Sequence, residues 1–422
     1  MTTTFSPSLC ISCIRSKQAQ VHAWLKEHED RYLPPIYSSV DIRDAGFKIA
    51  VVDTNLFPAG FNNLCEHGIE DAIKFFKQAI DKRVANGKNI LIIAEEHTRN
   101  TWYLEHVRIL QKIIHDAGFN ATIATFLSVQ PAFCQDATSV DLETATGQTV
   151  KIHCFKRILQ KIQSGEASYD LIIMNNDLTT GIPDILRETN IPIYPSIHAG
   201  WHSRSKSRHF FYTAGLIKDF AHLVGLDPWF FSCLDAVVDG ININEEQDRR
   251  KLYEAAQKLF AAIAAKYQEH HIQEKPFIFI KSDSGTYGMG VAAIESPEEI
   301  LELNRKEKNK LYKGKSSQVI TRYLLQEGVP SISTVGEHVS EAVIYQVDNN
   351  LVGGFYRYNI EKNSRENLNS TGMGFQKMCP HLPKYGDCGV HHDMNISDVY
   401  RMLARIAGVA ARKEICELEQ AL

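Results

Sequence analysis

The chain has 422 residues, of which 44% are hydrophobic and 23% are charged, and its formal net charge at pH 7 is -4. This length is sufficient for two or three domains with separate cores, and the composition is that of a globular protein. The net charge gives no excess of basic residues for binding nucleic acid, and no apolar segment approaches the length of a membrane span. Nucleic acid and membrane are therefore excluded as expected partners. We expect a cytoplasmic protein.

The nine cysteines are scattered and odd in number. This pattern predicts reduced thiols rather than a disulfide framework. Cys10 and Cys13 have the spacing of a metal-binding or redox pair, but they lack a second pair or nearby histidines to complete it. Zinc or redox chemistry at this pair is therefore the weaker interpretation.

Helical and strand-like segments alternate over the first half of the chain. Residues 1–46 are expected to form a helical segment, with a short helix over Val21–Glu29. Strands are expected at 48–52, 89–94, 120–126, 170–174 and 191–194, helices at 68–83 and 103–117, and a mixed segment at 150–163. Alternation at this spacing predicts a doubly wound, mostly parallel sheet whose ligands lie beyond the carboxyl ends of its strands.

Polar residues follow four of the expected strands. Each group consists of residue types that are ordinary in turns, so each by itself could be turn chemistry. Four groups on one edge of a sheet would together supply the amide, carboxylate and cationic groups that bind an amino acid. The groups occupy residues 53–63, 95–100, 175–181 and 198–210, and their candidate substrate-binding residues are Asn55, Asn62, Arg99, Asn176 and Arg204.

The most informative stretch, residues 277–291, reads FIFIKSDSGTYGMGV. A short apolar run rich in strand formers ends at Lys281 and passes directly into a loop with three glycines. Glycines let backbone N–H groups approach an anion closely, and a lysine at a strand end adds a charge within reach of phosphate oxygens. The spacing differs from the dinucleotide fingerprint and from the P-loop, and an ordinary tight hairpin is the alternative. The stretch resembles the second-lysine strand and glycine loop of ATP-grasp ligases.

Later segments follow the order that ATP-grasp ligases use, which is an interlobe hinge, a phosphate-facing arginine and an amide-rich loop. They are a strand over 319–325 with Gln326, Glu327 and Val329 after it, a hairpin over 342–358 that contains Arg357, and a loop over 365–374. An upstream lysine before a helix completes the pattern, and Lys206 is the preferred residue. Arg208 is its alternative, and a solvated basic run is the third interpretation.

Two further patterns are weak. Residues 314–316 read Gly-Lys-Ser, but Asn309 stands where a P-loop requires its first glycine, so we expect a surface loop. Residues 391–393 read His-His-Asp. Adjacent histidines on a strand cannot all face one ion, so a loop or a helix cap is preferred to a metal site there.

In eight segments the chain resembles a small proteobacterial group of glutamate-cysteine ligases, which is distinct from the better known enzymes of the same activity. The segments are residues 53–63, 95–100, 175–181, 200–210, 281–290, 326–329, 353–357 and 366–372. The resemblance leaves out roughly the first forty residues and the region 134–164. It implies ATP-dependent joining of the glutamate γ-carboxylate to the cysteine amine through an acyl phosphate, the first step of glutathione synthesis.

The resemblance also implies a fold. We expect an α/β protein in which a Rossmann-like, doubly wound sheet of the kind that precedes ATP-grasp regions is followed by an ATP-grasp region. The expected division is a helical segment at 1–46, an α/β substrate-binding domain at 47–205 and an ATP-grasp region with connecting helices at 206–422. The resemblance leaves a homo-oligomer open.

The implied small molecules are ATP, Mg²⁺, glutamate and cysteine. The implied catalytic residues are Lys206, Lys281 and Arg357. The implied ATP-binding residues are Lys206, Lys281, Ser284, Gly285, Thr286, Tyr287, Gly288, Gly290, Gln326, Glu327 and Val329, and Asn367 joins the substrate-binding residues. No clean copy of the usual Glu-x-Asn metal motif is present, so the best oxygen donors for magnesium by position are Glu341, Asn367 and Asn369.

Catalysis by such a site would consist of positioning and charge neutralisation, with no protein nucleophile and with the glycine loop excluding water. The nearest rival is an ATP-grasp ligase with a different amine acceptor. A two-lobed glycosyltransferase could bind a sugar nucleotide at the polar strand ends, but it leaves Lys281 and its loop unexplained. A non-catalytic nucleotide-binding protein would bind ATP without consuming it.

Overall fold

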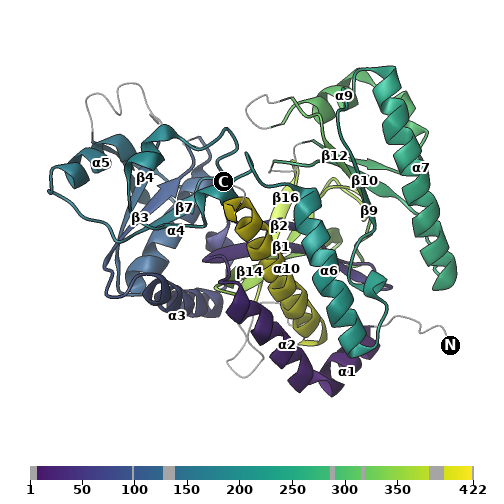
Figure 1. Cartoon of the computed structure of the whole chain (residues 1–422), viewed down its shortest axis with the longest axis horizontal. Coiled ribbons are helices and arrows are strands. Elements are labelled where there is room, and N and C mark those ends of the chain that lie inside the picture. Colours follow the sequence, from purple (N-terminus) through teal and green to yellow (C-terminus); the bar gives the residue numbers. More distant parts are fainter. Residues whose placement is uncertain are drawn as a thin grey trace.

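The structure, a computed structural model, describes residues 7–96, 99–126, 138–285, 290–314, 319–379 and 394–420. Three β-sheets organise these residues. In Figure 1 a parallel sheet lies at the left and a small sheet lies beside helix α7 (Glu246–Glu269) at the right. A central sheet lies between them, behind helices α6 (Lys206–Val224) and α10 (Met394–Gln420). Among the described residues, no helix combines the length and the apolar character that crossing a membrane requires.

The parallel sheet confirms the predicted doubly wound arrangement. Its strands are β3 (Asn89–Ala94), β4 (Asn120–Thr125), β5 (Ser139–Glu143), β6 (Thr149–Cys154), β7 (Leu171–Asn175) and β8 (Ile193–Tyr194), in the order β5-β6-β4-β3-β7-β8. All neighbours are parallel except β5 and β6. Ile90 and Ile92 pack with helices α3 (Glu66–Arg83) and α4 (Thr101–Asp116), whereas Leu91 and Ile93 pack with α5 (Phe155–Gln163). Helices therefore cover both faces, as a parallel sheet that is buried on both sides requires.

The central sheet is antiparallel and joins the two ends of the chain. Its strands are β1 (Tyr37–Asp44), β2 (Ile49–Asn55), β14 (His338–Val347), β15 (Asn350–Asn359) and β16 (Met373–Met378), in the order β16-β15-β14-β1-β2. Strand β13 (Thr334–Val335) pairs with β14 off this path. The predicted hairpin over 342–358 is confirmed as β14 and β15.

The central sheet corrects two predictions. Residues 37–44 form a strand rather than part of a helical segment, and the strand predicted at 48–52 belongs to this sheet rather than to the parallel one. Strand β1 was missed because Asp41 and Arg43 interrupt its apolar residues, although both side chains are held in ion pairs across the sheet. Composition alone does not show that such charges will be paired. The domain boundaries at 46/47 and 205/206 remain predictions.

The two faces of the central sheet differ in chemistry. On one face, Val40, Ile42 and Ile344 pack in a large core with residues of α6, α10, α1 (Pro7–Ser16) and α2 (Gln18–Arg31). The other face carries a row of charged side chains, Asp41, Arg43, Asp53, Glu341 and Arg357, and these line a cavity. The side-chain alternation of strands places these charged residues on the face opposite to Val40, Ile42 and Ile344.

The small sheet contains the lysine strand. Its strands are β9 (Asp235–Val238), β10 (Ile278–Ser282), β11 (Val291–Ile294) and β12 (Tyr323–Glu327), in the antiparallel order β11-β10-β12-β9. Helices α7, α8 (Glu299–Glu302) and α9 (Arg305–Tyr312) accompany them. Lys281 pairs with Val291 across β10 and β11, so the glycine-containing segment connects two antiparallel strands. The predicted α/β class with a doubly wound sheet in the first half of the chain is confirmed, and the ATP-grasp assignment of the second half stays a prediction.

One cysteine differs from expectation. Cys154 is disulfide-bonded, so the prediction of reduced thiols is wrong for this residue. Scattered spacing does not reveal which sulfur atoms the fold brings together. The free thiols among the described residues are Cys10, Cys13, Cys65, Cys233, Cys379 and Cys416.

A buried ion pair connects the central sheet to the small sheet. Lys48 Nζ lies 2.9 Å from Glu327 Oε2, and both side chains are fully buried. The ammonium also lies 4.2 Å from the ring centre of Trp229, whose Nε1 donates to Glu327 at 3.1 Å. Removing one partner of such a pair leaves an uncompensated charge in the interior.

We therefore expect Lys48→Ala to lower the free energy of unfolding by about 3–5 kcal/mol. Denaturant unfolding followed by circular dichroism measures the change. The matched control is Lys77→Ala, because Lys77 pairs with Asp81 at the surface, where such a change costs less than about 1 kcal/mol. Equal effects of the two substitutions would contradict the role given to the buried pair.

Candidate active site

A cavity forms where the charged face of the central sheet meets the lysine strand and the start of α6. It brings together seven residues that the sequence analysis assigned to ATP, metal or substrate: Lys206, Lys281, Gly285, Glu341, Arg357, Asn367 and Asn369. The remaining lining residues are Asp41, Arg43, Val52, Asp53, Phe279 and Val291. Residues from five regions of the chain thus share one site.

The two lysines of the cavity are held by different partners. Lys206 Nζ lies 2.8 Å from Asp53 Oδ1 and 4.5 Å from the ring centre of Trp201. Lys281 Nζ donates to the backbone oxygen of Val52 at 2.8 Å and to Gln326 Oε1 at 2.7 Å. Both side chains are almost fully buried, so each ammonium is fixed in place before any ligand arrives.

The electrostatics of this group follow from its burial. Burial lowers the pKa of Lys281 to about 8, and the positive charge of the neighbouring Lys206 adds to this decrease. The negative charge of Asp53 acts in the opposite direction but does not outweigh it. Burial acts to raise the pKa of Asp53, but the charges of Lys206 and Lys281 outweigh it and lower that pKa to about 2. Two cations thus share one carboxylate, and an additional anion such as a phosphate would relieve their repulsion.

Arg357 is clamped between two carboxylates. Its Nη1 lies 2.7 Å from Asp41 Oδ2 and 2.8 Å from Glu341 Oε1. The second oxygen of Glu341 accepts from Arg43 Nε at 2.7 Å. Because these four residues stand on three adjacent strands, the ladder pairing of the sheet fixes their relative positions.

The two carboxylates of this clamp differ in acidity. Burial raises the pKa of Asp41 despite the nearby Arg357, and the negative charge of Glu341 contributes to the rise. Burial acts in the same direction on Glu341, but Arg43 and Arg357 lower its pKa overall. Neighbouring acids whose pKa values move apart are typical of catalytic sites.

A second and larger cavity opens beside the first. Its volume is about 610 Å³, and Asp41, Asp53, Arg357 and Asn369 line both cavities. Its wall includes the amide or imidazole side chains of Asn55, Asn62, Asn63, Asn100, His106 and Asn369. It also includes the large aromatic side chains of Phe57, Trp102, Tyr103, Tyr345, Phe355 and Phe375. A cavity with many amide groups beside a cationic site can hold small polar molecules next to bound phosphate.

His106 in this wall is a neutral hydrogen-bonding group. Its Nδ1 accepts from the backbone N–H of Phe61 at 3.3 Å, which assigns the ring proton to Nε2, 3.1 Å from Asn175 Oδ1. Burial lowers the pKa of His106 to about 4. The ring is therefore neutral near pH 7, and its two hydrogen bonds fix its position in the wall.

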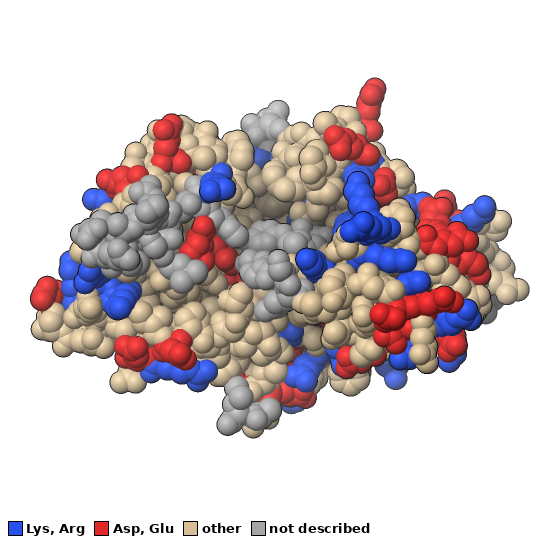
Figure 2. Space-filling model, turned by 90° about the horizontal axis from the view of Figure 1, so that it is seen from above, with Lys and Arg blue, Asp and Glu red and all other residues tan. Residues whose placement is uncertain are grey.

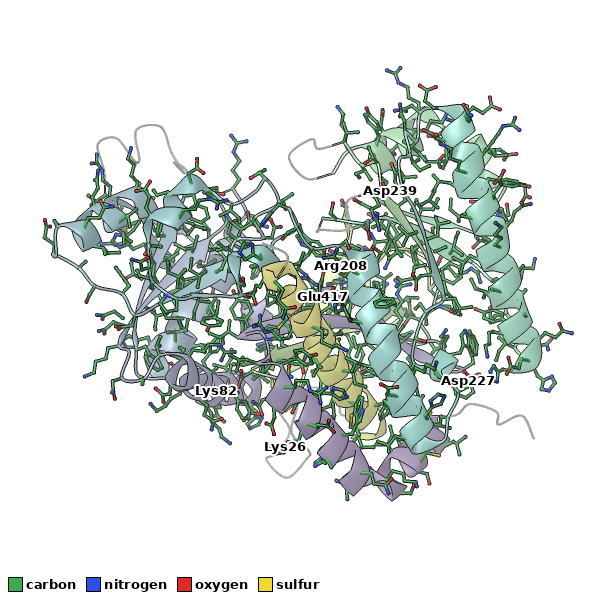
Figure 3. The ribbon with its side chains drawn as sticks, viewed as in Figure 1. Lys26, Lys82, Arg208, Asp227, Asp239 and Glu417 are labelled. Carbon is green, nitrogen blue, oxygen red and sulfur yellow. The ribbon has the colours of Figure 1, made fainter. Side chains whose placement is uncertain are left out.

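Several predicted residues lie away from both cavities. Arg204 forms a buried ion pair of 2.9 Å with Glu414 of α10, Glu327 is engaged by Lys48, and Val329 packs with Ala45 and Ala50. Asn176 accepts from the backbone of Leu178, Arg99 and Ser284 are exposed, and Gly290 is buried at the start of β11. Arg208 is exposed, and Figure 3 places it at the start of α6, with Glu417 near the end of α10. Thus Lys206, and not Arg208, lines the cavity.

Some predictions fall outside the described residues. Thr286, Tyr287 and Gly288 of the glycine loop lie there, as do residues 315–316 of the Gly-Lys-Ser segment and residues 391–393. The assigned roles of the site residues stay predictions, because their positions alone do not test them.

Three charged residues of the site were not predicted from the sequence. Asp53 directly follows a predicted strand and could have been found from that position. Asp41 and Arg43 could not have been found in this way, because the strand that carries them was not predicted. Asp41 and Asp53 are paired across β1 and β2, so both carboxylates reach the same cavity.

The residues of the cavity fit a magnesium ion in their chemistry. Magnesium prefers oxygen ligands and keeps several waters, so a sparse protein shell is sufficient. Each carboxylate oxygen of Glu341 already accepts from an arginine, and Asn367 Oδ1 accepts from the backbone of Asn369. Asp41 and Asp53 add carboxylate oxygens that the predicted ligand set did not include.

Comparison with known proteins agrees with this geometry. A site with two buried lysines, a clamped arginine and an adjoining amide-rich cavity suits an ATP-dependent carboxylate-amine ligase. A model of the family described as glutamate-cysteine ligase matches residues 12–415. The chain therefore belongs to the glutamate-cysteine ligase family. The match includes most of the first forty residues and the region 134–164, which the sequence resemblance had left out.

Solved structures are similar to the chain to different extents. A protein of Methylobacillus flagellatus KT, provisionally named a gamma-glutamylcysteine synthetase, is 32% identical, with 99% of each chain covered and a TM-score of 0.84. D-alanyl-alanine synthetase A of Vibrio cholerae O1 biovar eltor str. N16961 is 11% identical, with 76% of this chain and 81% of that chain covered and a TM-score of 0.34. A glutathione synthetase-like effector of Globodera pallida is 9% identical, with 88% of this chain and 80% of that chain covered and a TM-score of 0.35. No curated protein sequence matches the chain.

Lys281→Ala should leave the fold intact and reduce kcat by roughly 10²–10³-fold, because it removes a fixed charge from the predicted site of phosphoryl transfer. Lys281→Arg should restore little, since a planar guanidinium does not replace a compact ammonium. Steady-state kinetics and thermal unfolding measure both effects. The control is Lys275→Ala at an exposed position just before β10. An active Lys281→Ala enzyme with an unchanged melting temperature would overturn the role of this lysine.

The lowered pKa of Lys281 predicts a pH dependence. The ammonium is charged below about pH 8 in the free enzyme and loses its proton above it. Phosphate binds the charged form, so the KM for ATP should stay low below pH 8 and rise as the pH increases beyond it. The measurement is a pH series of KM at saturating amino acids. A guanidinium stays protonated throughout this range, so the rise near pH 8 should be absent from Lys281→Arg, and a rise of the same size in that variant would contradict the assignment.

Proposed function

We propose that this protein uses ATP to join the γ-carboxylate of glutamate to the amine of cysteine, giving γ-glutamylcysteine, ADP and phosphate, the first step of glutathione synthesis. The observation that carries the proposal is the shared wall of the two cavities, where Arg357, Asp41, Asp53 and Asn369 separate the lysine site from a cavity of about 610 Å³. ATP phosphates would occupy the lysine site, and the amino acids the larger cavity. Family membership supports the same reaction.

The first chemical step is phosphoryl transfer. An oxygen of the glutamate γ-carboxylate attacks the γ-phosphorus of ATP, the bond to the bridging oxygen breaks, and ADP leaves with an acyl phosphate formed. Charge on the transferring group is spread over its oxygens, so catalysis consists of positioning and neutralisation. Lys206, Lys281 and Arg357 supply three positive charges around the site. Asp53 holds Lys206, Asp41 and Glu341 hold Arg357, and the side-chain oxygen of Gln326 holds Lys281.

The second step is acyl transfer to the amine. The cysteine nitrogen attacks the carbonyl carbon of the acyl phosphate, loses a proton and expels phosphate. No protein nucleophile is required, and none of the free thiols among the described residues lines either cavity. Asn55 and Asn62 in the larger cavity and Asn367 in the smaller one are the proposed substrate-binding residues.

A magnesium ion, when bound, would neutralise phosphate oxygens and orient the transferring group. Glu341, Asn367 and Asn369 are its proposed ligands, and Asp41 and Asp53 are additional oxygen donors in the same cavity. We also infer a cytoplasmic location, where ATP is supplied, and leave a homo-oligomer as an expectation.

Release of ADP in a coupled assay tests the proposal directly. We expect release with glutamate and cysteine together and γ-glutamylcysteine in the product mixture by mass spectrometry. A panel of other amines in place of cysteine identifies the acceptor. Preference for a different amine would change the assigned acceptor but leave the protein an ATP-dependent ligase. If no pair of substrates led to consumption of ATP, the proposed function would be overturned.

The proposed intermediate predicts the fate of an oxygen atom. With ¹⁸O in both γ-carboxylate oxygens of glutamate, one labelled oxygen should appear in phosphate for each turnover, because the amine displaces phosphate at the carbonyl carbon. Mass spectrometry of the phosphate measures this transfer, and Lys281→Ala should suppress label transfer and turnover together. Label in AMP with release of pyrophosphate would instead show an adenylate intermediate.

A further inference from the structure

Three side chains from distant parts of the chain meet outside the two cavities. Cys65 caps the N-terminus of α3, His67 lies in the first turn of that helix, and Cys379 directly follows β16. Their ligand atoms all lie within 4.8 Å of one another, and Cys379 Sγ lies 3.6 Å from His67 Nδ1. The two cysteines are buried and contact each other, whereas the histidine is partly exposed.

The distance between the sulfur of Cys379 and the ring nitrogen of His67 fits a tetrahedral metal ion. Zinc binds thiolate sulfur at about 2.3 Å and imidazole nitrogen at about 2.0–2.1 Å, so a tetrahedral angle places the sulfur and nitrogen roughly 3.5–3.6 Å apart. The distance of 3.6 Å between Cys379 and His67 agrees with this value. Two cysteines and one histidine also form a known zinc ligand set that leaves the fourth position to water.

We propose that Cys65, His67 and Cys379 bind a zinc ion. The chemistry of the ligands supports this class of metal, because thiolate and imidazole together favour zinc over the magnesium of the active site. Each thiol loses a proton to the solvent when its sulfur binds, while the imidazole binds in its neutral form. Affinity should therefore fall as the pH decreases.

The site would connect two segments of the wall around the large cavity. Asn62 and Asn63 precede Cys65 by only a few residues, and Gly374 and Phe375 similarly precede Cys379. All four of these residues line the cavity of about 610 Å³. A zinc ion would thus tie the start of α3 to the end of β16, just beyond the walls that they form. The importance of this tie for catalysis rests on the proposed function, but zinc binding itself does not.

Metal analysis of the full-length protein tests the proposal without an activity assay. After incubation with zinc and removal of excess metal, we expect one zinc ion per chain by mass spectrometry. Cobalt in place of zinc should give thiolate-to-metal charge-transfer absorption. Both signals should be lost in Cys65→Ser and in Cys379→Ser and kept in Cys233→Ser, a matched thiol outside the cluster.

The serine variant of Cys65 also controls for folding. Cys65 Sγ accepts from the backbone N–H of Gly68, and a serine hydroxyl makes this cap at least as well, so Cys65→Ser should fold normally. A zinc chelator should lower the melting temperature of the parent protein and leave that of Cys379→Ser unchanged. Absence of bound zinc, loading that survives Cys65→Ser, or a disulfide between Cys65 and Cys379 that prevents binding would overturn the proposal. Each of these results would leave the ligase activity to be judged by its own assays.

Discussion

The clamp on Arg357 is the interaction on which the site depends. Its guanidinium is held by Asp41 and Glu341, and Glu341 is held in turn by Arg43. These charges are buried and would be costly to leave unpaired, so each keeps the others in position. Because the four residues stand on β1, β14 and β15, the clamp forms only when strands from both ends of the chain have paired.

This sheet pairing explains how one cavity collects residues so distant in sequence. Strands β1 and β2 bring Asp41 and Asp53, while β14 and β15 bring Glu341 and Arg357. The small sheet adds Lys281, and the ion pair between Lys48 and Glu327 ties that sheet to the centre. The site is therefore a property of the assembled sheets rather than of either half of the chain. Charged side chains of both signs are scattered over the face seen in Figure 2, whereas the two lysines of the site are buried.

The balance of charge in the cavity also suits its proposed chemistry. Lys206 and Lys281 repel each other and are partly neutralised by the one carboxylate of Asp53. A triphosphate would complete this neutralisation, and the preset positions of the cations reduce the reorganisation that is needed in the transition state. Arg357 is already paired with two carboxylates. It therefore contributes less uncompensated positive charge than the lysines, but the orientation of its guanidinium is fixed.

The sequence by itself determined the local elements and the residues with strong local signals. The apolar run ending at Lys281, the glycines after it, the hairpin before Arg357 and the helix after Lys206 were predicted because each depends on neighbours in the chain. The alternating strands of the parallel sheet were predicted for the same reason, since their apolar runs reflect burial on both faces.

Only the tertiary structure decided which of these residues meet. Strand β1 was missed because Asp41 and Arg43 are charged residues in a buried strand, and their partners lie about 300 positions away, Glu341 being 298 residues after Arg43. Glu327 and Arg204 had the right local context for ligand binding, yet buried partners, Lys48 and Glu414, engage them away from the cavities. A buried charge costs little free energy when the fold places a partner beside it, and much when the charge stays unpaired. The local sequence does not show whether a partner from a distant segment will be there.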